Sequence, residues 1–190
     1  MSSPDEKFLE RVTQCIAQPG PNAPRGVRHS ILAQAARLAQ SRPVGDEATA
    51  PSGFDPAAAA LFEGTVESAY LVATTDGPLS STEDAVLRAI VGIGCDGKVS
   101  PEQIEALFGE LVATQKRESE EERVAHIAQM ITQQDHQREV LRIAAIMARA
   151  SGGVRPEERA LLERIAQRFT LGSAAVDEVI AEAFEALGAA

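Results

Sequence analysis

Three short stretches of the chain place carboxylate side chains beside a glycine in the same order. They are residues 76–83, 96–103 and 151–158, and each reads Asp or Ser, Gly, any residue, Leu or Val, Ser or Arg, two further residues, then Glu or Gln. Carboxylates gathered at a glycine turn are the ligands that hard divalent cations prefer. The pattern therefore suggests a cation site, with Asp76, Glu83 and Asp96 as its candidate ligands.

The stretches match only the second half of a calcium-binding EF-hand loop, which has Gly at its sixth position and Glu at its twelfth. Positions one and three of such a loop must supply carboxylates. Here these two positions are filled, copy by copy, by Val72 and Thr74, by Gly92 and Gly94, and by Met147 and Arg149. A true EF-hand is therefore excluded, and a cation site of another, weaker kind is left.

The same residues also have an interpretation as boundaries between helices. Gly77 can adopt the left-handed backbone that ends a helix. Ser80 is a good N-cap, and Glu83, three residues later, completes a capping box; the second copy repeats this arrangement. In the third copy Ser151 replaces the acid, and Arg155 is a poor cap. Capping explains most of the pattern, and the cation site remains as the alternative.

Other groups of chemically useful residues are sparse. Glu122 and His126 lie four residues apart, and Asp135, His136 and Glu139 follow, so that a His–carboxylate metal site can be drawn from them, although their spacing matches no established motif. The sequence has no nucleophile motif and no phosphate-binding glycine loop. We therefore predict no enzymatic activity and no cofactor, with a divalent cation as the alternative.

The elements that must position these residues are all helical. Alanine-rich composition and apolar residues at helical spacing predict helices over 5–17, 28–41, 57–74, 81–94, 101–115, 118–133, 135–150, 156–170 and 173–188. We predict an all-α fold, a compact bundle of about seven helices with a two-helix N-terminal extension. The predicted boundaries are an N-terminal helical arm and linker over 1–56 and a helical domain over 57–190.

The net charge excludes one class of partner, and the cysteines and apolar runs indicate the compartment. The net charge of −10 lies entirely in residues 57–190, because residues 1–56 hold six basic and six acidic side chains. An acidic body repels phosphate backbones, so nucleic acid is not expected as a partner. Cys15 and Cys95 form no disulfide framework, and no apolar run is long enough to span a membrane. These features predict a cytoplasmic protein.

The repeated stretches resemble the TerB-like family, which is named for tellurite-resistance proteins. The signature of that family is an apolar helix ending in Ala-x-x-Asp-Gly-x-Val/Ile-Ser-x-x-Glu, followed by a leucine-rich helix. Residues 73–83 match this signature, and residues 148–162 are similar to its second occurrence. The resemblance covers roughly residues 57–188 and implies a compact helical bundle without established catalytic activity. It also implies metal binding through acidic residues, stress response and multi-protein assembly.

We therefore predict a non-catalytic adaptor or scaffold that mediates protein–protein interaction in a cytoplasmic, stress-related assembly. Its partner would be another protein or a second copy, docked through the N-terminal arm. The apolar faces of that arm are too small to fold alone, so they must pack on the domain, on another copy or on a partner. The alternative function is divalent-cation binding in tellurite or stress resistance. If a metal site of the family uses the acid at the start of both matching stretches, the first stretch supplies Asp76 here. The second stretch has Ser151 at the corresponding position.

Overall fold

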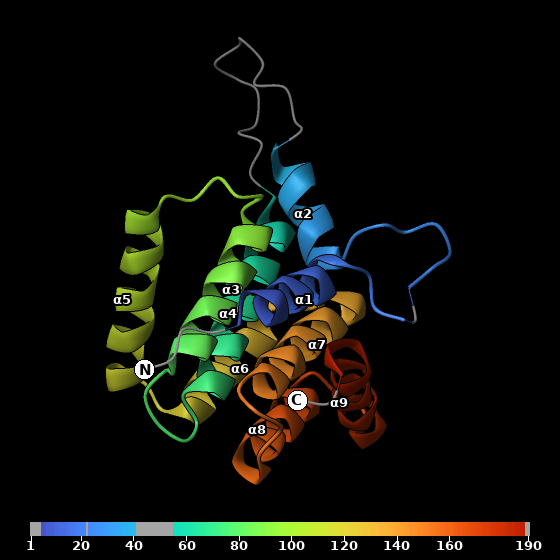
Figure 1. Cartoon of the computed structure of the whole chain (residues 1–190). Helices are drawn as coiled ribbons and strands as arrows, with labels where there is room; N and C mark the ends of the chain where they lie inside the picture. Colours follow the sequence, from blue (N-terminus) through green and yellow to red (C-terminus); the bar gives the residue numbers. More distant parts are fainter. Residues whose placement is uncertain (1–4, 22, 41–54, 189–190) are drawn as a thin grey trace.

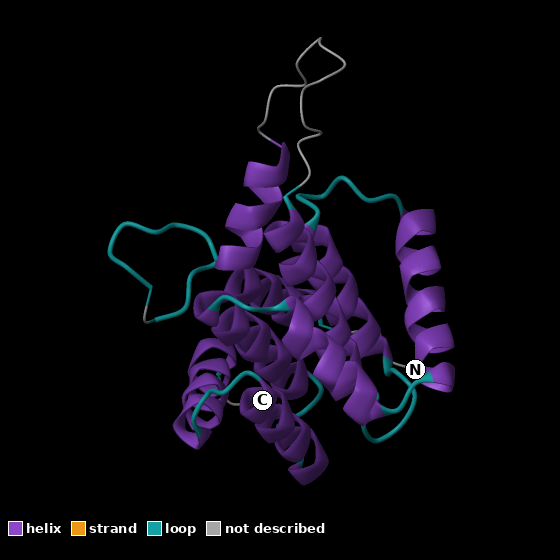
Figure 2. Cartoon of the chain, turned by 180° about the vertical axis from the view of Figure 1, so that it is seen from behind, coloured by secondary structure: helices purple, strands orange, loops and turns teal. Residues whose placement is uncertain are grey.

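The computed structural model describes residues 5–21, 23–40 and 55–188, and every regular element in them is an α-helix (Figure 2). The nine helices within these residues are α1 (Glu6–Ala17), α2 (Ile31–Gln40), α3 (Pro56–Ala73), α4 (Ser81–Gly94), α5 (Pro101–Arg117), α6 (Glu120–Met130), α7 (Gln134–Ala150), α8 (Pro156–Arg168) and α9 (Ser173–Leu187). The predicted all-α fold is confirmed, with seven helices after residue 55 and two before it. None of the described helices is long and apolar enough to cross a membrane.

The centre of the bundle is the pair formed by α3 and α7 (Figure 1). Every residue of α7 from Glu139 to Ala150 is buried. In α3, Gly64 lets Ile131 approach so closely that a Cβ at Gly64 would lie 3.0 Å from the isoleucine side chain. Gly64 therefore brings the end of α6, where Ile131 lies, close to α3, and the larger Leu, Ile and Val residues of α4, α6, α8 and α9 fill the space around α3 and α7.

The first two helices pack on the rest of this same chain. Val12 and Ile16 of α1 and Leu32 of α2 are fully buried in the common core, and both helices contact α4 and α7. Glu139 of α7 also accepts a hydrogen bond from the backbone N–H of Leu32, at 3.4 Å. The apolar faces of the arm are thus satisfied within the chain, one of the possibilities left open by the sequence. Residues 41–54 of the predicted arm and linker lie outside the described residues.

One helix, α5, stands away from the bundle in both views (Figures 1 and 2). Its buried residues are Phe108 and Leu111. Arg88 of α4 bonds to Glu105 at 2.7 Å and lies over the Phe108 ring. Near its C-terminal end, Gln115 accepts a hydrogen bond from the Tyr70 hydroxyl at 2.7 Å. The apolar stripe predicted for this helix is therefore only partly covered, and Val112 remains exposed.

Candidate functional site

Two of the three repeated corners lie together at one end of the central helix pair. The turn from α3 to α4 carries Asp76, and the turn from α7 to α8 carries Arg155. The guanidinium group of Arg155 forms an ion pair with Asp76. The same group reaches Glu83 Oε1 at 3.6 Å and Glu158 Oε1 at 3.2 Å. Three carboxylates from two distant segments therefore converge on one arginine, and we call these four residues the corner cluster.

Helix capping places the two glutamates of the corner cluster. Glu83 accepts a hydrogen bond from the Ser80 backbone N–H at 2.7 Å, and Glu158 accepts one from the Arg155 N–H at 2.7 Å. Both glutamates are buried, with 4% and 0% of their surface exposed. Gly152 precedes Arg155 with a φ of +117°, which strongly favours glycine. The tight turn brings the Arg155 side chain back over its own helix start, where it meets the carboxylates.

The corner cluster does not fit a bound divalent cation. A protein-borne cation, the Arg155 guanidinium, already lies among the three carboxylates. Throughout the described part of the chain, no three His, Cys, Asp or Glu side chains are grouped so that they could hold a metal ion. The second acid that the family resemblance requires is replaced by Ser151, whose hydroxyl lies 3.3 Å from Glu158 Oε1.

The three predicted metal ligands are not brought together. Asp76 and Glu83 share Arg155, but Asp96 lies at the opposite end of α4. α4 ends at Gly94, so the helix rise from Glu83 to that end is about 17 Å, and Asp96 lies beyond it. Asp96 adopts a left-handed backbone with a φ of +51° and pairs with Lys98 at 3.7 Å. Asp96 therefore belongs to a different turn, the one between α4 and α5.

The second group of predicted candidates is also divided. Glu122 caps α6 by accepting a hydrogen bond from the Ser119 N–H at 2.8 Å, and this bond lowers the pKa of its carboxyl group. Asp135 accepts a hydrogen bond from the His136 N–H at 3.0 Å. Glu139, in contrast, is buried and faces Arg142. The three carboxylates have structural partners of their own, and among the described residues they and the two histidines form no group that could hold a metal ion.

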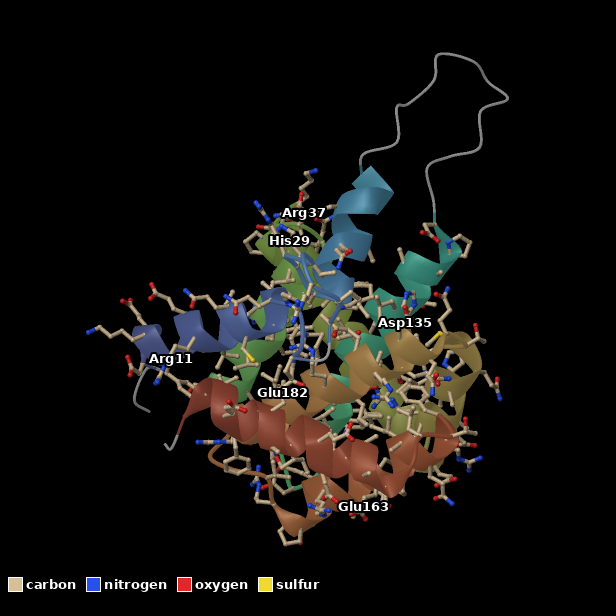
Figure 3. The ribbon with its side chains drawn as sticks, turned by 90° about the vertical axis from the view of Figure 1, so that its right-hand side faces the viewer. Arg11, His29, Arg37, Asp135, Glu163 and Glu182 are labelled. Carbon is tan, nitrogen blue, oxygen red and sulfur yellow. The ribbon has the colours of Figure 1, made fainter. Side chains whose placement is uncertain are left out.

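A groove that the sequence did not predict lies where the described residues between α1 and α2, 18–21 and 23–30, run past α7 and α9. It encloses a cavity of about 460 Å³, within the range of about 300–1,000 Å³ that is typical of ligand sites. We call it the arm groove. Its walls are mostly apolar and include Pro19, Pro21, Pro24, Val27, Ile31, Leu141, Ala175 and Val179. Figure 3 shows this side of the molecule, with Glu182 on the part of α9 that faces α1.

Three charged residues form the floor of the arm groove. Arg142 donates two hydrogen bonds to Glu139, at 2.9 and 3.0 Å. It also donates to the carbonyls of Cys15 and Ile16, at 3.0 and 3.3 Å, near the C-terminal end of α1. A cation at that end is favoured by the helix dipole. Glu182 lies farther from Arg142, at 3.5 Å.

Burial and neighbouring charges shift the pKa values of two residues on this floor, Glu182 and Arg142. Burial raises the pKa of the Glu182 carboxyl group; Arg142 opposes the rise, and Glu139 adds to it. For Arg142, burial is the largest influence and lowers the pKa, but the charge of Glu139, its hydrogen bonds and the charge of Glu182 act together, and the pKa lies above its ordinary value. A half-buried carboxyl group with a raised pKa in a cleft is a common mark of a functional site.

One signal in the sequence pointed to this floor. Glu139 and Arg142 stand three residues apart in a helix that is otherwise apolar on nearly every face. Charged residues are almost never fully buried unless they are paired. Their presence in the central helix indicates a buried ion pair, but the contributions of Glu182 and of residues 18–21 and 23–30 depend on tertiary packing.

Comparison with known proteins identifies one family. The family model described as tellurite resistance protein TerB matches residues 69–181, which include both corners of the corner cluster. No curated protein and no solved structure gives a significant match.

Proposed function

Because this chain belongs to the tellurite resistance protein TerB family, we propose that it is a non-catalytic adaptor that holds a partner protein in the arm groove. The body of the adaptor is the helical bundle, and its binding surface is the face where α1 and residues 18–21 and 23–30 lie beside α7 and α9. We place the assembly in the cytoplasm and in a stress response, as the name of the family suggests. The absence of a disulfide between Cys15 and Cys95 suits a reducing compartment.

The observation that carries this proposal is the arm groove itself. A cavity of about 460 Å³ with mostly apolar walls opens at the surface beside the half-buried Glu182. Concave apolar surfaces with a few placed polar groups are the usual form of binding sites. The groove is built partly from the N-terminal arm, so the arm contributes to docking as a wall of the site.

The ionic contacts of the floor support binding rather than catalysis. Arg142 has both arms of its guanidinium group engaged, with Glu139 and with the end of α1. A general acid or base must be within reach of a substrate and able to exchange a proton. Glu139 is poorly placed to exchange a proton, because it is buried and accepts two hydrogen bonds from Arg142. This arrangement stabilises a rigid surface.

Site-specific photocrosslinking in the native host tests the proposal. A photoreactive residue is placed at Gln34, an exposed position on the wall of the arm groove, or at Gln167, an exposed glutamine of α8 outside it. We expect a discrete adduct from Gln34 that Gln167 does not give. The partner identified in the adduct is then purified, and its binding to the whole chain is measured by calorimetry. Equal labelling at both positions, or no binding by the purified partner, would contradict the adaptor function.

The alternative, divalent-cation binding in tellurite or stress resistance, has less support. The corner cluster already contains the cationic Arg155, and Asp96 is remote from the other two candidate ligands. Titration with calcium, zinc and manganese decides between the functions. Heat of binding, together with a higher midpoint of thermal unfolding at millimolar ion, would favour this alternative.

A further inference from the structure

The buried charges on the floor of the arm groove do not cancel. Glu139 and Glu182 supply two carboxylates, and Arg142 is the cation between them. The hydrogen bonds of Arg142 go to Glu139 and to the carbonyls at the end of α1. Glu182 Oε1 lies 3.5 Å from Arg142 Nη1, a nitrogen that already donates to the Cys15 carbonyl at 3.0 Å. It is therefore the carboxylate with spare capacity to accept a hydrogen bond.

The other charged side chains that line the groove do not neutralise this excess of negative charge. Arg138 and Glu178 pair with each other at 3.9 Å, while Asp135 adds another carboxylate to the lining. His29 lies 2.7 Å from a guanidinium nitrogen of Arg37 through its Nε2 atom. Four carboxylates therefore face two guanidinium groups around the cavity.

An occupant of this cavity must satisfy two conditions at once. It must bring apolar surface, because the walls are largely proline, valine, isoleucine and leucine. It must also bring positive charge, because a buried carboxylate is stabilised most by a cation that hydrogen-bonds to it. Glu182 is 16% exposed as a side chain, so it is reachable from the groove while being largely removed from water.

We propose that the arm groove binds a segment of a partner protein in which a lysine or arginine is flanked by apolar residues, with Glu182 as the acceptor for the cationic side chain. This inference rests on the proposed adaptor function and adds the chemistry of the partner. The apolar flanks lie against the proline-rich wall and against Val179, and the cation points toward the floor.

Selection from a random peptide library tests this chemistry directly. Phage-displayed dodecapeptides are selected on the whole folded chain and, separately, on the Glu182→Gln variant. We expect the wild type to enrich lysine or arginine next to Leu, Ile, Val or Phe, and the variant to lose the enrichment of the cation. The enriched peptide is then synthesised, and we expect Glu182→Gln to weaken its binding about tenfold, as for one charge-assisted hydrogen bond.

The matched control is Asp177→Asn, another carboxylate of α9, which pairs with Arg159 outside the groove. It should enrich the same peptides as the wild type. Thermal unfolding of both variants confirms that they fold. Enrichment of neutral or acidic peptides, or of the same cationic peptides by Glu182→Gln, overturns the inference while leaving groove docking intact. If no peptide is enriched, the inference fails as well. The absence of any Gln34 crosslink, in contrast, would remove the adaptor function itself.

Discussion

Arg155 forms an ion pair with Asp76 across 79 residues of sequence, and through it the corner after α3 is joined to the corner after α7. The arginine side chain is 40% exposed, but Glu158, one of its two other partners, is fully buried. A position that the sequence pattern presented as a poor cap is thus the centre of an ionic network. Its cationic side chain is the counter-ion of the three carboxylates of the corner cluster.

Replacing Arg155 by alanine is expected to destabilise the protein by about 1–3 kcal/mol, because the buried Glu158 would lose its charged partner. The cost should stay below that of breaking a fully buried pair, since the arginine side chain is partly in water. Urea unfolding measures the change. Arg155→Lys is the control: it keeps the charge, loses the forked geometry and should fall between wild type and alanine. No loss of stability in the alanine variant would show that the corner cluster is energetically neutral.

Two glycines of α4 should respond in opposite directions to alanine. A Cβ at Gly94 would lie 2.5 Å from a ring carbon of Phe62, whereas a Cβ at Gly92 meets nothing within 4 Å. Gly94→Ala is therefore expected to cost about 1–3 kcal/mol through overpacking. Gly92→Ala should raise the free energy of unfolding by about 0.5–1 kcal/mol, because alanine loses less conformational entropy than glycine when the helix forms. Denaturant midpoints of the two variants give the comparison, and equal shifts would argue against the close approach of α3 to the end of α4.

Because the N-terminal arm packs on the rest of the chain, truncating the side chain of Ile16 should strongly destabilise the protein. This side chain is fully buried in the common core, so Ile16→Ala should lower the free energy of unfolding by about 2–5 kcal/mol. Val112→Ala on the exposed side of α5 serves as the matched apolar control and should change stability by less than about 0.5 kcal/mol. Similar small effects from both would mean that α1 is not docked on the domain in solution.

The raised pKa of Glu182 makes part of the stability depend on pH. Because burial raises this pKa above its ordinary value of 4.5, the folded state holds the proton more tightly than the unfolded state. The resulting stabilisation is complete below pH 4.5 and is lost as the pH rises through the folded pKa. The difference in unfolding free energy between wild type and Glu182→Gln should follow this course. A difference that does not vary with pH across this window would contradict the raised pKa.

The positions of the helices could be predicted from the sequence, but the contacts between helices that are distant in the sequence could not. Ser80 with Glu83, and Ser100 with Gln103, predicted capping boxes that the structure confirms, because capping is decided within four residues. The neighbourhood of Asp76 and Arg155 depends on how α3 and α7 pack, which local pattern does not encode. For the same reason the sequence grouped Asp96 with Asp76, although the length of α4 separates them.

The arm groove shows a similar limit. Glu139 and Arg142 stand out in the sequence as charges within an apolar helix. Their third partner, Glu182, is 40 residues away, and the wall of Pro19, Pro21 and Pro24 reads in the sequence only as a helix breaker. Prolines that end one helix and also line a cavity cannot be recognised until the path of residues 18–30 is known.

The slight attachment of α5 has a consequence for the order in which the molecule opens. This helix holds to the bundle through Phe108, Leu111 and a few polar contacts, so it can detach without exposing the centre at α3 and α7. It should behave as a separate cooperative unit whose sub-global opening needs far less free energy than complete unfolding. Native-state hydrogen exchange should therefore find the amides of α5 exchanging well before those of α7.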